Sequence, residues 1–288
     1  MENAQSRTGK WLDRIVSLFL FLGIGSLIIL VFSPWRPMFK NNDSLDYLGR
    51  LAVAVVLLIV VLLIQNKEWA AKYKPLLTAL WILSVAVLVD VVFGVFLIKH
   101  LNVTDAAPKG WAAQKLNESV IVVLAILILN KTWGGSLGSI YVQKGNLKLG
   151  LIIGIATFVL AAAGSIPMAT LFNAKDLTIA RIVPWIPWIL IIVLSNGVLE
   201  EVMFRGLFLR KLEPFWGKFM SNLLVALLFT VLHGTVTYTA DNLIFVAVLF
   251  PLALLWGYVM QKTDSIWGSV LFHAGMDIPI FLGIFSNL

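Results

Sequence analysis

Long apolar runs dominate this chain and limit what it can fold into. A helix needs about 20 consecutive, mostly apolar residues to cross the hydrocarbon core of a bilayer, and nine runs of roughly this kind follow one another along the sequence. Because 60% of the 288 residues are hydrophobic and only 13% are charged, the chain cannot cover a water-exposed surface with polar groups. We therefore expect an all-α, polytopic transmembrane helical bundle of eight or nine spans.

The limits of the runs predict where these spans lie. They cover residues 15–33, 51–65, 76–98, 119–129, 149–171, 182–209, 219–235, 243–260 and 266–285. The fourth run is short, and an extension back to Trp111 would give it the length of a span. The first run follows Arg7, Lys10 and Arg14, as in a signal peptide, but no small-residue cleavage site ends it, so we expect an uncleaved first span.

Charge and cysteine content exclude several classes of protein. The formal net charge is +7, but the cations lie mostly in short connections between apolar runs, where membrane topology accounts for them and a nucleic-acid partner is not needed. With the N-terminus placed inside, 14 of the 22 Lys and Arg residues fall inside and 8 outside, which favours a cytoplasmic N-terminus and an integral, multi-pass protein of the cell membrane. The chain has no cysteine, so disulfides, thiolate metal sites and cysteine nucleophiles are excluded.

Few ionisable residues fall inside the expected spans, and six of the seven lie in the last ninety residues. An ionisable group in the bilayer core is costly and is a candidate functional residue by default. The seven residues are Asp90, Glu200, Glu201, Arg205, His233, His273 and Asp277. Asp90 stands alone without a motif around it, and structural packing accounts for it best. The other six point to a single polar site built from three helices.

Helical spacing predicts how these side chains face one another. Glu201 and Arg205 stand one turn apart with the acid first, which favours an internal ion pair. Glu200 lies about 100° round the helix from Glu201 and is free to face something else. One turn also separates Phe229 from His233, and His273 from Asp277. A carboxylate beside a neutral imidazole can deprotonate water, and a second polar group can stabilise an oxyanion, which together describe amide hydrolysis.

Three ordered motifs carry a resemblance to a known family. They are Glu200-Glu201-Val-Met-Phe-Arg205, Phe229-Thr-Val-Leu-His233 and His273-Ala-Gly-Met-Asp277. In this order, and each within an expected span, they resemble the signatures of the family of CAAX proteases and bacteriocin-processing enzymes (CPBP, also called Abi), which includes the type II CAAX prenyl endopeptidase. The resemblance runs from about residue 182 to the C-terminus and implies a glutamate-dependent intramembrane endopeptidase.

The resemblance also implies roles for individual residues. Glu200 and His233 would activate the water, His273 and Asp277 would stabilise the oxyanion, and Glu201, Arg205 and Phe229 would shape the site. The prenyl endopeptidase has Asn where this chain has Asp277. An ionised Asp cannot donate a hydrogen bond, so Asp277 must be protonated or must orient His273 through its imidazole N–H, and we favour the second role.

A catalytic zinc ion is the alternative to a metal-free site. Glu200, His233 and His273 are suitable ligand types, although the sequence has no His-Glu-x-x-His helix. We expect no cofactor, and zinc on these three residues is the alternative that activity in the presence of a chelator would exclude.

Three functions fit the sequence. We expect an endopeptidase in which residues 1–181 supply N-terminal spans and residues 182–288 form the motif-bearing core of one bundle, with membrane lipid and a peptide or membrane-protein substrate as its partners. A non-proteolytic bacteriocin-immunity or regulatory protein of the same fold is the first alternative. A proton-coupled transporter is the second, but transporters usually carry polar, broken helices in both halves, and here the polar residues lie at one end of the chain.

Overall fold

The chain forms a bundle of long helices. The computed structural model describes residues 4–32, 39, 42–94, 107–234 and 241–288, and these residues contain helices and no strand. The longer helices are α1 (Ala4–Leu18), α2 (Ser26–Phe32), α3 (Asp43–Ile64), α4 (Lys74–Phe93), α6 (Lys109–Thr132), α7 (Leu147–Ala163), α10 (Ile186–Glu200), α11 (Leu207–His233), α12 (Asn242–Thr263) and α13 (Trp267–Ser286). Short elements connect them: η1 (Phe19–Gly25), η2 (Glu68–Ala70), η3 (Leu137–Ile140), α8 (Ser165–Ala169), η4 (Thr170–Phe172), α9 (Ile179–Ile182), η5 (Val183–Trp185) and η6 (Glu201–Gly206).

Seven helices of the described residues are long and apolar enough to cross a membrane, or eight with the bent pair Leu147–Ala163 and Ser165–Phe172. One of the seven, Ile179–His233, has 55 residues. At 1.5 Å per residue it would be about 80 Å long, far more than the hydrocarbon thickness of about 30 Å. It must therefore cross more than once.

The long helix reverses its direction at Gly217. This residue has φ 72° and ψ 170°, outside the helical region, and Pro214 precedes it. The rings of Phe204 and Phe229 lie 5.1 Å apart, although 25 residues of straight helix would separate them by about 37 Å. The segment is thus two crossings joined by a turn, and the described residues contain eight candidate spans, or nine with the bent pair, in agreement with the eight or nine that the sequence predicts.

The helices follow the apolar runs with two differences. The fourth span is longer than its run of residues 119–129, since α6 begins at Lys109, as the extension towards Trp111 anticipates. The fifth, expected over residues 149–171, bends by 68° between α7 and α8. Residue 33, residues 95–98 and residue 235, at the ends of three expected spans, lie outside the described residues.

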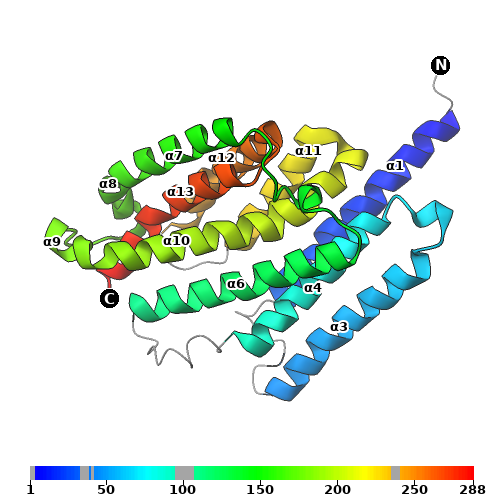
Figure 1. Cartoon of the computed structure of the whole chain (residues 1–288), viewed down its shortest axis with the longest axis horizontal. Helices are drawn as coiled ribbons and strands as arrows, with labels where there is room; N and C mark the ends of the chain where they lie inside the picture. Colours follow the sequence, from blue (N-terminus) through cyan, green and yellow to red (C-terminus); the bar gives the residue numbers. More distant parts are fainter. Residues whose placement is uncertain (1–3, 33–38, 40–41, 95–106, 235–240) are drawn as a thin grey trace.

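Helix α13 lies against α7, α10 and α12, and α6 lies along the other side of α10 (Figure 1). Glycines allow the closest of these contacts. A Cβ atom on Gly268 of α13 would lie 2.7 Å from the carbonyl oxygen of Gly150 on α7, and one on Gly197 of α10 would lie 3.0 Å from that of Val270. Small residues let transmembrane helices approach closely, and here they bring α10 and α13, which carry two of the motifs, side by side.

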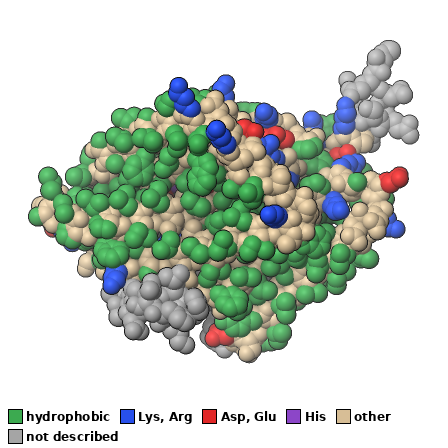
Figure 2. All heavy atoms as spheres, viewed as in Figure 1, with side chains coloured by type: hydrophobic (Ala, Val, Ile, Leu, Met, Phe, Trp, Pro, Cys, Tyr) green, Lys and Arg blue, Asp and Glu red, His purple; other side chains and the backbone are tan. Residues whose placement is uncertain are grey.

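The outer surface of the bundle is apolar. Figure 2 shows hydrophobic side chains over most of one face, with Lys and Arg gathered mainly towards the end at which the chain begins. Large side chains such as Leu63, Leu160 and Leu243 are more than 60% exposed. An apolar patch of this extent is rare on a soluble monomer, and the described residues therefore form an integral, multi-pass membrane protein.

Candidate active site

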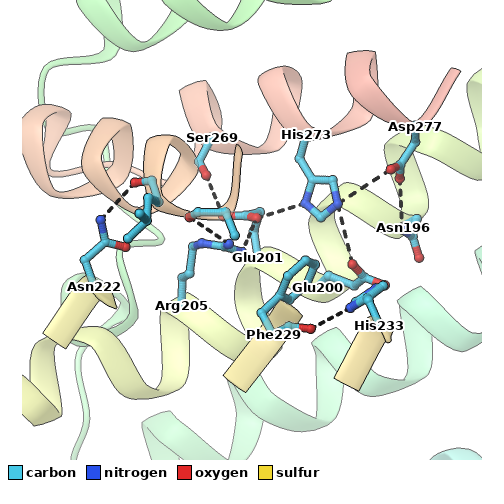
Figure 3. A network of polar contacts seen from close by, with 12 residues as sticks. Asn196, Glu200, Glu201, Arg205, Asn222, Phe229, His233, Ser269, His273 and Asp277 are labelled. Atoms are coloured by element: carbon cyan, nitrogen blue, oxygen red, sulfur yellow. Dashed lines mark hydrogen bonds and ion pairs between the residues drawn. The ribbon is translucent and has the colours of Figure 1, made fainter. Parts of the chain in front are cut away.

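The first motif lies where α10 passes into η6, a short π-helical segment. Glu200 is the last residue of α10 and Glu201 the first of η6. A π-helical turn holds more residues than an α-helical one, and such segments are frequent at functional sites. Both glutamates are buried and face the interior of the bundle, where they contact different partners (Figure 3).

Glu201 is the centre of a fully buried polar network. Its Oε1 atom accepts from Arg205 Nη1 at 2.6 Å and lies 2.9 Å from His273 Nδ1, and Ser269 Oγ donates to its Oε2 at 2.5 Å. Ser269 and His273 are one turn apart on α13 and reach the same carboxylate. Glu201 thus connects the first motif with the third.

Arg205 is held among aromatic rings. Its Nη2 donates to the carbonyl oxygen of Ala253 on α12 at 3.0 Å. Its Cζ lies 4.9 Å from the ring centroid of Phe229 and 5.2 Å from that of Trp256, distances at which a guanidinium interacts favourably with an aromatic face. Arg205 therefore joins η6 to the second motif on α11 and to α12.

Glu200 lies between the two histidines. Its Oε1 is 3.7 Å from His233 Nε2, and its Oε2 is 3.5 Å from His273 Nε2. These distances are longer than a direct hydrogen bond. Oε2 is also buried without a hydrogen-bond partner among the described residues, so the carboxylate has room to accept from a further group.

The backbone fixes the orientation of His233. Its Nδ1 lies 2.8 Å from the carbonyl oxygen of Phe229, one turn earlier on α11. A carbonyl only accepts, so Nδ1 carries the proton and, in the neutral ring, Nε2 presents a lone pair towards Glu200. Phe229 also packs its ring 4.2 Å from the imidazole. The second motif thus selects one tautomer of the histidine.

His273 is oriented by Glu201, and this corrects the role we favoured for Asp277. The hydrogen bond at Nδ1 goes to Glu201, whereas Asp277 Oδ1 lies 3.7 Å from Nε2, beyond hydrogen-bond distance. Asp277 instead accepts from Asn196 Nδ2 at 2.9 Å. The indole of Trp256 stacks on the imidazole with 3.9 Å between centroids and 9° between planes. Glu201 and Trp256 therefore hold this ring, and Asp277 is not the residue that fixes its tautomer.

An apolar cavity of about 130 Å³ opens beside this site. Asp241, Asp277 and Trp256 are its polar lining residues, and the remaining wall comes from α12, α13, α8 and η4. Leu249, Leu252 and Met276 are among the apolar side chains that line it. An apolar side chain in this cavity would lie next to the group of carboxylates and imidazoles.

The described residues do not form the ligand set that the zinc alternative requires. Among the described residues, no group of three or more His, Asp or Glu side chains is arranged to hold a metal ion. His233 Nε2 and His273 Nε2 both face Glu200, each towards a different oxygen of its carboxylate. The three side chains are therefore arranged around the carboxylate and not around one common metal position. We therefore derive no chemical step through a metal.

The structure brings together every site residue that the sequence singled out. Glu200, Glu201, Arg205, Phe229, His233, His273 and Asp277 form one connected group (Figure 3). Asp90 lies on α4 and is buried, and it takes part in none of the contacts described for this group. Sequence reasoning missed Asn196, Ser269 and Trp256. Asn196 precedes Glu200 by one turn and Ser269 precedes His273 by one turn, so the helical period would have indicated both, but Trp256 has no such signal.

Comparison with known proteins agrees with the three motifs. Residues 182–279 match the family described as type II CAAX prenyl endopeptidase Rce1-like. No curated protein and no solved structure matched the chain. The matched segment contains all three motifs and each residue of the polar group. Over residues 182–279 the chain is therefore similar to the Rce1-like family of type II CAAX prenyl endopeptidases, which agrees with the resemblance that the three motifs carry.

Proposed function

We propose that this protein is an intramembrane endopeptidase that hydrolyses peptide bonds of membrane-associated peptides or proteins with a water molecule activated by Glu200 and His233. The observation that carries the proposal is that two hydrogen-bond acceptors, a carboxylate oxygen of Glu200 and an imidazole nitrogen of His233, face each other. Glu200 Oε1 and the lone pair of His233 Nε2 lie 3.7 Å apart. Two acceptors at this distance need a donor between them, and water supplies two O–H groups.

The same geometry directs the attack. A water that donates to both Glu200 and His233 turns its lone pairs away from them, towards a substrate carbonyl carbon. As the C–O bond forms, Glu200 takes the proton from the water, and the carbonyl oxygen becomes an oxyanion. Collapse of the tetrahedral intermediate then breaks the C–N bond, with that proton passing to the leaving amine.

His273 supplies the donor for the oxyanion in this proposal. Its Nδ1 donates to Glu201, so its Nε2 donates only when the ring is doubly protonated. Nε2 faces Glu200 Oε2 and Asp277 Oδ1, and both oxygens only accept when ionised. Before substrate binds, a proton on Nε2 can be shared with Glu200 Oε2 and Asp277 Oδ1. During the reaction, the same N–H group donates to the oxyanion. Glu201 and Arg205 act as positioning residues for this ring.

The apolar cavity favours a substrate with a large apolar side chain close to the scissile bond. Its wall is mostly hydrophobic, and Asp241, Asp277 and Trp256 are its polar lining residues. Burial of one Leu- or Phe-sized side chain there would contribute about 1.5–3 kcal/mol to binding. We also propose that the protein lies in the cell membrane and that its N-terminus is cytoplasmic.

The test compares the full chain with its Glu200→Gln and His233→Gln variants. Membrane peptidomes of cells with the wild type and with Glu200→Gln identify peptides that depend on the protein, and these serve as substrates for purified enzyme in vesicles. We expect each variant to cleave about 10²–10⁴ times more slowly, because each loses one acceptor of the nucleophilic water. Asp90→Asn, which changes a buried acid outside the site, is the matched control and should cleave normally.

Three outcomes would overturn the proposal. Unchanged peptidomes and unchanged cleavage in both site variants would exclude the protease. A protection phenotype that survives in these variants would favour the immunity or regulatory function. Activity that a chelator abolishes and zinc restores would replace the metal-free mechanism by the zinc alternative.

A further inference from the structure

A second cavity lies outside the polar site, at the end of the bundle where the chain begins. It has a volume of about 360 Å³ and lies between the start of α4, the end of α6 and the turn within α11. Four cations line it, namely Lys72, Lys74, Arg210 and Lys211, and we call it the basic pocket. No Asp or Glu is among the described residues that line it.

The cations of the basic pocket outnumber the carboxylates that pair with them. Lys72 pairs with Asp13 at 2.6 Å, and Arg210 pairs with Asp264. Lys74 and Lys211 form no ion pair with any carboxylate in the part of the chain that the structure describes. Four basic side chains and two carboxylates leave Lys74 and Lys211 without an acidic partner in the described part of the chain, and an anionic phosphate would supply one.

Several donors of the basic pocket are available to an anion. Lys211 Nζ donates to the carbonyl oxygen of Ser139 at 3.2 Å, which uses one of its three hydrogens. Arg210 Nε is buried without a hydrogen-bond partner among the described residues. Helix α4 begins at Lys74 without a side-chain cap, so its free N–H groups add to the positive potential. A buried donor without a partner destabilises the protein, and a bound phosphate oxygen would satisfy this donor.

Apolar side chains form much of the rest of the basic pocket, together with the polar residues Thr78, Asn130 and Ser139. Pro75, Ala79 and Ile82 of α4 form one wall, and Trp133 at the end of α6 forms another, with its ring centroid 4.6 Å from that of Trp81 and the two ring planes tilted by 51°. A free phosphate ion would gain nothing from contact with apolar walls, whereas the glycerol and the upper acyl chains of a lipid would pack against them. Basic pockets between transmembrane helices are the kind of site that binds phospholipid headgroups.

We propose that the basic pocket binds the headgroup phosphate of an anionic phospholipid, with Lys74, Lys211 and Arg210 as donors and Trp133 against the glycerol region. The bound lipid holds α4, α6 and the turn of α11 together at this end of the bundle. This proposal is independent of the proposed protease activity, since the basic pocket shares no residue with the polar site.

The test measures lipid binding to the full chain by native mass spectrometry after exchange into a lipid-free detergent. The probes are dioleoylphosphatidylglycerol, dioleoylphosphatidylcholine and inorganic phosphate. We expect the wild type to retain phosphatidylglycerol in preference to phosphatidylcholine. Lys74→Gln/Lys211→Gln should bind phosphatidylglycerol about 25-fold more weakly, because each Lys near the headgroup contributes about fivefold. Lys144→Gln/Lys148→Gln, which removes two exposed cations outside the pocket, should bind as the wild type does.

A second variant keeps the proposal testable if the double variant does not fold. Thr78→Trp retains all four cations but fills the cavity, since Thr78 lines it, and should also lose phosphatidylglycerol. Binding that is unchanged in Thr78→Trp or in a folded double variant would overturn the proposal. Equal binding of the two lipids would overturn it as well, and stabilisation by inorganic phosphate equal to that by phosphatidylglycerol would identify a free-phosphate site instead.

Discussion

Two buried ion pairs of this protein share the same local sequence pattern. Asp46 and Arg50 on α3 and Glu201 and Arg205 on η6 are both acid-first pairs one turn apart, with N–O distances of 2.7 and 2.6 Å. In each pair the side chains are less than 10% exposed. By spacing, chemistry and burial they are alike, and yet only one belongs to the candidate active site.

The difference lies in what surrounds each pair. Glu201 also contacts His273 and Ser269 on α13, and Arg205 lies against the rings of two other helices. The Asp46–Arg50 pair lies in the first turns of α3, whose outer face is largely exposed. A buried ion pair is weak evidence of function by itself. Its contacts with other helices decide whether it positions a reactive group.

Removal of the acid from each pair gives the largest expected contrast. Glu201→Gln and Asp46→Asn should both lower the free energy of unfolding, by up to about 3–5 kcal/mol, since each removes the carboxylate that pairs with a buried Arg one turn away. Only Glu201→Gln should lose peptide cleavage, by about 10- to 100-fold in kcat, because His273 loses a charge-assisted hydrogen bond. Chemical denaturation and cleavage kinetics in the same detergent measure both effects. Equal loss of activity in the two variants would remove the distinction between the pairs.

Ser269→Ala sharpens the comparison with a smaller change. Ser269 donates to Glu201 Oε2 and does not contact the reacting groups. Loss of one hydrogen bond to a charged acceptor should cost about 1.5–3 kcal/mol of stability and reduce kcat several-fold, with KM unchanged. Ser84→Ala on α4, which removes a buried hydroxyl bonded to a backbone carbonyl, is the matched control and should leave kcat unchanged. A rise in KM alone would show that Ser269 acts on substrate binding.

Asp277→Asn should have the smallest effect of the three. Glu201, and not Asp277, makes the hydrogen bond that orients His273, and an Asn keeps the shape of the side chain and still accepts from Asn196. We therefore expect cleavage to change by less than the 10-fold that one typical hydrogen bond represents. A loss as large as that of Glu201→Gln would show that the carboxylate of Asp277 is required, and would restore the role that the sequence suggested for it.

Much of the fold was predictable from the sequence because the bilayer imposes simple rules. Nine apolar runs predict the spans, and the described helices follow them. The turn at Gly217 was implicit in the gap between the sixth and seventh runs, residues 182–209 and 219–235. The bend between α7 and α8 was not predictable, because the hydrophobic run continues through it.

The candidate site was predictable in its members but not in its connections. Rare ionisable residues in apolar spans identify Glu200, His233 and His273, and the one-turn spacing predicts the Glu201–Arg205 pair. Helical period alone does not reveal which residue of one helix meets which residue of another. For this reason the sequence assigned the orientation of His273 to Asp277, its neighbour on the same helix, whereas the partner is Glu201 from a different helix.

The sequence by itself determined that this protein spans a membrane, where its helices lie, and which few charged residues must be buried, because each of these follows from the cost of polar groups in hydrocarbon. Tertiary structure alone decided which buried pair belongs to the candidate site, how Glu200 comes to lie between two imidazoles, and that Trp256 stacks on His273. These contacts join residues from separate helices. Their geometry depends on how closely glycines let those helices pack, which no local pattern encodes.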